Sequence, residues 1–174
     1  AGQKGTGKWT TETALNIGIP APSLDAAVES RVLSYFKEDR INLSKKVNKE
    51  YPENSYDKEK VIKDLEDSLL FSYLILFSQG LWIISEASKD YGFDINILEV
   101  LRIWKGGCII RSKMLNFVGD IVREDMENVN LLNNDKSLEF LMGKVDSVKN
   151  IVSIARDYYI PTLVHNTALD YFFS

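Results

Sequence analysis

The chain has 174 residues, of which 45% are hydrophobic and 26% charged, and its net charge is −4 at pH 7. This length suits a single globular domain, residues 1–174, and the composition is that of an ordinary soluble protein. The acidic balance argues against a general nucleic-acid binder, because such proteins carry a basic excess. Cys108 is the one cysteine in the sequence, which excludes an internal disulfide framework and favours a reducing, cytoplasmic location.

The first residues form the one stretch that is both glycine-rich and basic, Gly2-Gln3-Lys4-Gly5-Thr6-Gly7-Lys8-Trp9. Its glycines leave the backbone free to lie close against a ligand. A helix beginning just after the stretch, at Thr10, would direct unpaired N–H groups toward an anion held there. The stretch is not a P-loop, because Trp9 stands where that motif needs the hydroxyl that binds Mg²⁺. The alternative interpretation is an N-terminal tail with incidental charge.

Apolar residues recur at helical spacing along most of the chain, and no segment alternates with the period of two that a strand requires. The second predicted helix takes Ser23 as its N-cap, and Arg31 lies beside its apolar stripe, which comprises Val28, Val32, Tyr35 and Phe36. Residues 42–57 and 128–135 are polar and are predicted to form loops. The predicted helices are residues 10–17, 23–36, 57–91, 96–105, 108–125, 136–158 and 162–173.

The predicted helix over residues 57–91 is apolar on nearly every face between Leu69 and Ile84. A membrane span requires about 20 apolar residues, whereas this stretch is interrupted by polar side chains and closed by acidic residues at both ends. A helix that is apolar all round is also typical of the centre of a helical domain or of a subunit interface. We therefore predict an all-α fold with this helix at its centre, and no association with a membrane.

No local pattern specifies a nucleophile, a metal site or a cofactor site. His165 is the one histidine, and it has no carboxylate or thiol at local spacing, so we expect a structural role. No set of histidines, cysteines and carboxylates has the spacing of metal ligands, and no bound metal is expected. Cys108 is interpreted as a small buried residue, and Arg111 and Lys113 as part of a helix-packing block. The residues alone therefore predict a helical domain with a basic loop that could hold an anion.

Two blocks of the sequence resemble 6-phosphogluconate dehydrogenase, the decarboxylating enzyme of the pentose phosphate pathway. The first is Ala1 to Thr10, AGQKGTGKWT, and the second is Trp104 to Ser112, WKGGCIIRS. Lys105 stands where this family usually has arginine, which keeps the charge but loses the bidentate fork. The similarity extends weakly through most of the chain and implies the helical C-terminal domain of the family, with a long apolar central helix.

The resemblance implies an NADP-dependent oxidoreductase that oxidises 6-phosphogluconate, releases CO₂, yields ribulose 5-phosphate and forms a homodimer through this domain. The family's NADP-binding domain and its catalytic lysine and glutamate precede the first block, and its C-terminal tail would lie beyond Ser174. We therefore expect a fragment that is inactive alone and that holds no catalytic and no cofactor-binding residue. Two residues are carried over: Lys4 matches the family's substrate-phosphate lysine, and Arg31 matches an arginine that contacts the same phosphate.

Two alternatives stay open on the sequence. The first is a helical dimerisation or interaction module without enzymatic activity, whose apolar central helix binds a partner. The second is a related β-hydroxyacid dehydrogenase, which shares the two-domain plan but is not expected to carry the loop that contains Lys4.

Overall fold

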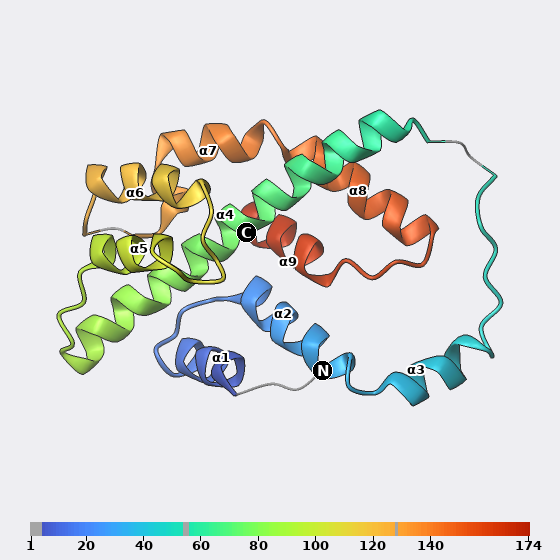
Figure 1. Ribbon diagram of the computed structural model, residues 1–174, viewed down its shortest axis with the longest axis horizontal. Coiled ribbons are helices and arrows are strands. Elements are labelled where there is room, and N and C mark those ends of the chain that lie inside the picture. The colour runs from blue at the N-terminus through green and yellow to red at the C-terminus, as the bar shows by residue number, and fades with distance from the viewer. Residues whose placement is uncertain (1–4, 54–55, 128) are drawn as a thin grey trace.

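The computed structural model describes residues 5–53, 56–127 and 129–174, and within them the fold is all-α, as predicted (Figure 1). A long diagonal helix, α4, runs through the molecule, and most of the other helices lie against it. The helices are α1 (Thr6–Asn16), α2 (Pro22–Leu33), α3 (Lys37–Ser44), α4 (Lys58–Tyr91), α5 (Ile97–Lys105), α6 (Met114–Glu124), the 3₁₀ turn η1 (Leu131–Asn133), α7 (Asp135–Met142), α8 (Val145–Asp157) and α9 (Leu163–Phe173).

Helix α4 begins and ends where the sequence predicts. The carboxylate of Asp57 accepts hydrogen bonds from the backbone N–H groups of Glu59 (2.9 Å) and Lys60 (3.2 Å). These bonds satisfy two of the donors that the start of a helix leaves unpaired. At the other end Gly92 adopts a φ of 67°, the left-handed conformation that commonly terminates helices. Both signals are local, which is why the sequence was sufficient here.

The main hydrophobic core lies along α4. Phe71, Leu74, Ile75 and Leu81 are fully buried on this helix, and apolar side chains from α5 to α9 complete the cluster. Burying a side chain of this size contributes about 1.5–3 kcal/mol to stability. A smaller cluster holds α1 and the start of α2 against the same helix at Ile83. Helix α4 is therefore the surface on which both parts of the domain assemble.

Within the described chain, α4 is the one helix that is long and apolar enough to cross a membrane by length and composition. More than half of its most apolar window is buried inside the protein, and the core helix of a soluble protein meets the same criterion. Several of its polar side chains are also buried, which suits a helix with polar partners inside a protein: Ser68, Ser72, Ser78 and Gln79.

The starts of the first two helices differ from the prediction. Helix α1 begins at Thr6 rather than Thr10, because Gly5 takes a left-handed φ of 86° and turns the chain directly into the helix. Helix α2 begins at Pro22, and Ala21 rather than Ser23 occupies its N-cap position. Proline suits the first helical position, since its missing N–H would have no partner there.

The predicted apolar stripe on α2 is wrong in its second half. Helix α2 ends at Leu33, and the side chains of Val32, Tyr35 and Phe36 are 41%, 75% and 48% exposed. Only the half-buried Val28 faces a neighbouring helix, as described below. Periodicity places residues on a common face, but it does not say whether another element covers that face.

Two predicted helices differ in extent from the observed ones. Residues 136–158 form α7 and α8, separated by Gly143 and Lys144. In the other case, the helix predicted over residues 108–125 begins only at Met114, after a turn in which Gly107 has a φ of 140°. The predicted buried position of Cys108 is also inaccurate, because this side chain is partly exposed.

The asparagine-rich segment after α6 is not an exposed loop in its described part, residues 129–135. Val129 and Leu131 are buried in the main core. Asn130 lies between them, and its side-chain oxygen accepts hydrogen bonds from Ser78 Oγ of α4 (3.0 Å) and from the backbone N–H of Leu132 (3.2 Å). The polar residues thus have different roles: Asn130 bonds to α4 and Asn134 caps α7, while Asn133 and Asp135 are exposed.

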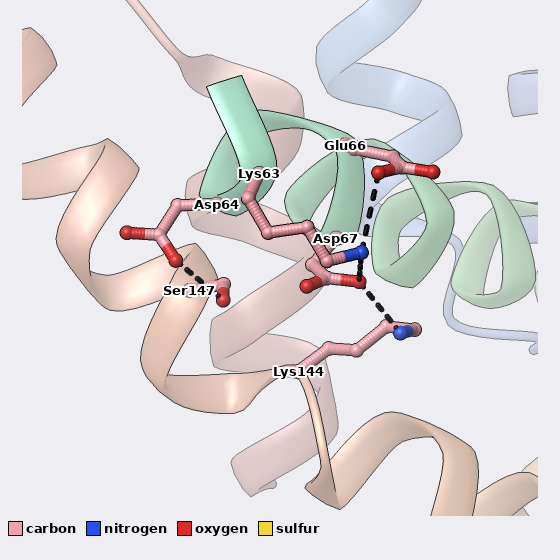
Figure 2. Close-up of polar contacts among 6 residues, drawn as sticks. All are labelled: Lys63, Asp64, Glu66, Asp67, Lys144 and Ser147. Carbon is pink, nitrogen blue, oxygen red and sulfur yellow. Dashed lines mark hydrogen bonds and ion pairs between the residues drawn. The ribbon is translucent and has the colours of Figure 1, made fainter. Parts of the chain in front are cut away.

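Two aspartates at the start of α4 fix helix α8 in place, and Figure 2 shows the residues around them. Asp64 accepts hydrogen bonds from Lys60 Nζ (2.6 Å), Ser147 Oγ (2.9 Å) and Asn150 Nδ2 (2.5 Å). One turn later, Asp67 accepts from Nζ of Lys144 at 2.7 Å. The bond from Lys60 lowers the pKa of Asp64, and the bond from Lys144 lowers the pKa of Asp67.

We expect Asp64→Ala to destabilise the fold by about 1–3 kcal/mol, because Ser147 and Asn150 would lose their acceptor in a partly buried position.

The two aspartates also predict that the fold is less stable at acidic pH. A carboxylate whose folded pKa lies below its unfolded value of about 3.9 stabilises the fold above that value, and this stabilisation is lost as the pH falls toward the folded pKa. Urea unfolding at several pH values between 7 and 3 measures both effects.

The matched control is Asp146→Ala, because the Asp146 carboxylate is fully exposed and its nearest cation, Lys149, lies 3.9 Å away. This variant should stay close to the wild type at every pH. The interpretation of the network is wrong if Asp64→Ala unfolds at the wild-type urea concentration and keeps the wild-type dependence on pH.

Candidate functional site

The candidate site is built on one face of α2. Leu24, Val28 and Arg31 follow one another at spacings of four and three residues, so they share a face of this helix. Arg31 lies in the last turn of α2 and is exposed to solvent. Val28 packs against the first of the two blocks that carry the family resemblance, and Leu24 lines a cavity together with the second.

The first block contacts this face through Gly7. A Cβ atom at Gly7 would lie 2.8 Å from Val28 Cγ2, closer than such atoms approach in proteins, so the first turn of α1 packs directly on α2. The N-cap of α1 is Gly5, which offers no side chain to the N–H groups of the first turn, and that turn holds no acidic residue. Such a turn is suited to an anion.

Lys4, the other predicted phosphate ligand, lies outside the described residues. The structure therefore places Arg31 but does not test whether the two cations converge. It does place the start of α1, two residues after Lys4, against Val28, one turn before Arg31. The assignment of both residues stays a prediction.

The second block lies at the other end of the same face. Trp104, residues 109–112 and α4 line a cavity of about 400 Å³ together with Leu24. Lys105 donates a hydrogen bond from Nζ to Asn116 Oδ1 (3.1 Å) and so joins the end of α5 to α6. The predicted helix-packing role of Arg111 and Lys113 is wrong, since both are exposed in the turn before α6, and Arg111 borders the cavity.

Gln79, a residue that sequence reasoning missed, holds the start of α2 on α4. Its side-chain oxygen accepts hydrogen bonds from the backbone N–H groups of Ser23 (3.2 Å) and Leu24 (3.3 Å). Its side-chain nitrogen donates to Ser23 Oγ (3.2 Å), and both residues are fully buried. The only sequence signal was a polar residue inside an apolar run. This contact fixes the orientation from which Arg31 extends.

His165 has the structural role that the sequence predicts. Its Nδ1 lies 2.9 Å from both Ser68 Oγ and Ser72 Oγ, which joins the first turn of α9 to α4. Burial lowers the pKa of His165, and a hydrogen bond with Ser68 partly opposes that shift. The two serines are 0% and 4% exposed, so neither hydroxyl can reach a substrate. The group therefore resembles a Ser–His pair in composition only.

Comparisons with known proteins agree with this arrangement. The family model described as the C-terminal domain of 6-phosphogluconate dehydrogenase matches residues 1–174. A decarboxylating 6-phosphogluconate dehydrogenase of Synechocystis sp. is 34% identical over 172 residues, covering 99% of this chain and 36% of the relative. Decarboxylating enzyme 1 of Saccharomyces cerevisiae is 37% identical over 174 residues, with 99% and 36% covered.

A solved structure extends the similarity to three dimensions. The 6-phosphogluconate dehydrogenase of Plasmodium falciparum, described in its apo form and in complexes with NADP⁺ and with 6-phosphogluconate, superposes with a TM-score of 0.90 at 32% identity. The match covers 99% of this chain and 38% of that one. The chain thus spans a little over a third of the length of these relatives. The chain belongs to the 6-phosphogluconate dehydrogenase family and corresponds to its C-terminal domain.

Proposed function

We propose that residues 1–174 act as one helical domain of a cytoplasmic, NADP-dependent, decarboxylating 6-phosphogluconate dehydrogenase. In this role the domain binds the phosphate of 6-phosphogluconate, which the enzyme converts to ribulose 5-phosphate and CO₂, and it supplies the contact between the two subunits of a homodimer. The observation that carries the proposal is the single face of α2 on which both family-like blocks meet and which ends at Arg31.

Phosphate binding explains why this face combines a guanidinium with a glycine-rich helix start. Arginine can give a phosphate two parallel hydrogen bonds, while Lys4 supplies a compact positive charge. The first-turn N–H groups of α1 add donors without a side chain. Holding the phosphate end of the substrate also positions its reacting carbon, so binding energy gained here can raise kcat as well as lower KM.

NADP is assigned mainly to another domain of the complete enzyme. The described residues form helices, whereas the βαβ unit that holds a dinucleotide pyrophosphate on a helix N-terminus needs strands. The contribution of this chain is to bind and orient the substrate for chemistry performed by groups outside these residues.

In the complete protein, Lys4→Ala and Arg31→Ala should each raise KM for 6-phosphogluconate about ten- to a hundredfold. That factor corresponds to the loss of one charge-assisted interaction. KM for NADP should stay nearly unchanged in both variants, and steady-state kinetics with each substrate varied in turn measure the difference.

Lys8→Ala is the matched control, because Lys8 belongs to the same basic stretch but lies on α1, where its Nζ is 3.3 Å from Glu12. This variant should keep the wild-type KM values for 6-phosphogluconate and for NADP. A wild-type KM for 6-phosphogluconate in both Lys4→Ala and Arg31→Ala would remove the basis for the phosphate site.

The homodimer is supported by an exposed apolar stripe on α4. Ile62, Leu65, Leu69 and Tyr73 are 57%, 42%, 42% and 53% exposed, and their spacing places them on one side of the helix. This side is opposite to the one that carries the main core. Contiguous apolar surface of this kind marks interaction sites, and the same stripe is what a non-enzymatic dimerisation module would use.

Leu69→Glu should raise the dissociation constant of the dimer about thirtyfold or more, because it places a charge at the centre of the stripe. Sedimentation equilibrium over a range of protein concentrations measures the constant. Leu15→Glu is the control, since Leu15 is a 73% exposed leucine on α1, away from the stripe. Equal dissociation constants for the two variants would exclude this face as the dimer contact.

A further inference from the structure

Residues 35–49, here called the arm, extend away from the rest of the domain. Every residue of the arm is exposed, including all of α3. Figure 1 shows α3 lying away from α4, and the arm returns to the domain only at its last residue, where Lys49 Nζ lies 5.6 Å from the ring centroid of Tyr159, just after α8. Large apolar side chains are nonetheless frequent in it, with exposures between 37% and 75%: Tyr35, Phe36, Ile41, Leu43 and Val47.

Helix α3 has little support within the described residues. Isolated helices shorter than about 12–15 residues are marginal in water, and α3 has eight residues and a phenylalanine as its N-cap. Burial against another surface normally supplies the missing free energy. None of the described residues of the chain covers α3, so the surface that supports it lies outside them.

The charges of the arm indicate that the surface on which it packs is acidic. The arm has five basic residues and only two acidic ones, Glu38 and Asp39, whereas the chain as a whole has a net charge of −4. Acidic side chains collect instead on α6, α7 and their connection, where six exposed carboxylates accompany two basic residues. Met126 and Leu138 are exposed on the same elements, at 56% and 38%. This acidic, partly apolar surface complements the arm in both respects.

The arm of one molecule is too far from its own acidic surface to bind it. Figure 1 places α3 at one end of the molecule and the α6–α7 pair at the opposite end, with α4 between them. An antiparallel pairing of two α4 helices would reverse one molecule relative to the other, and would bring each arm toward the acidic end of the partner. A twofold arrangement of this kind forms both contacts and closes on itself.

We propose that the arm is an exchanged element: residues 35–49 of each subunit pack on the acidic α6–α7 surface of a second copy of this chain. The proposal rests on the homodimer proposed above and adds a second contact to the α4 stripe. Basic side chains of the arm, among them Lys45 and Lys46, lie opposite the carboxylates of the partner, and the apolar side chains of α3 cover its exposed Met126.

Isotope-resolved cross-linking tests the exchange directly. Equal amounts of ¹⁴N- and ¹⁵N-labelled chain are mixed, allowed to re-equilibrate and treated with a carbodiimide, which joins lysines to carboxylates that touch. We expect links from Lys45 or Lys46 to Glu124, Asp125 or Glu127, with about half of them in mixed ¹⁴N/¹⁵N pairs, as random re-pairing of equal amounts requires. The Lys8–Glu12 pair, 3.3 Å apart on one helix, is the internal control and must link within a single isotope.

Charge reversal provides the second measurement. Lys45→Glu/Lys46→Glu should raise the dimer dissociation constant about tenfold or more at low salt, and adding Glu127→Lys/Glu139→Lys should recover most of the loss. Lys8→Glu should have no effect. The chain could dimerise while no mixed-isotope link involves the arm and charge reversal has no effect. In that case the proposed exchange of residues 35–49 is wrong, and the proposed homodimer through α4 is unaffected. If the chain is monomeric at every concentration, both proposals fail together.

Discussion

The buried side chain of Gln79 is the constraint on which the candidate site depends. Its amide accepts from two backbone N–H groups of α2 and donates to the Ser23 hydroxyl, so it satisfies the start of a helix from the middle of another one. A leucine of similar size would leave those donors without partners in the interior. Because a helix is rigid, fixing Ser23 in the first turn of α2 also fixes the position of Arg31, about two turns later.

Along α4, too, apolar burial stabilises the packing and polar side chains fix the position of the neighbouring helices. Apolar burial supplies most of the stabilising free energy, but it is not directional, and several helices could slide along such a surface. Polar side chains at separate points of α4 remove that freedom. Asp64 and Asp67 hold α8, Ser68 holds α9 through His165, and Ser78 holds the segment around Asn130. These three neighbours are thus each joined to a particular part of the central helix.

Prediction from the sequence succeeded where the deciding interaction is local and failed where it is not. Both ends of α4 follow from Asp57 and Gly92, and the start of α5 follows from Asn96, whose side chain accepts from the N–H of Glu99. The break before α8 was missed, although Gly143 is the C-cap of α7, and the next residue, Lys144, contacts an aspartate 77 residues earlier in the chain. Gln79 is likewise separated from Ser23 by 56 residues.

The candidate site shows the same limit. Arg31 was found by resemblance, and no periodicity or spacing could have distinguished it from any other exposed arginine. The structure adds what the sequence could not contain, namely that Gly7 and Leu24 bring the two family-like blocks to one side of α2. The exposure of Tyr35 and Phe36 was missed for a related reason, because an amphipathic pattern does not identify what covers the apolar face.

The hydrogen bonds between α4 and its neighbours have a consequence for motion. A slip of α2, α8 or α9 by one turn along α4 would break these bonds, so gradual shear of these helices is disfavoured. We expect faster movement in exposed segments such as residues 35–49. A ligand that docks on α2 meets a surface already rigid, and little ordering entropy remains to be lost there on binding.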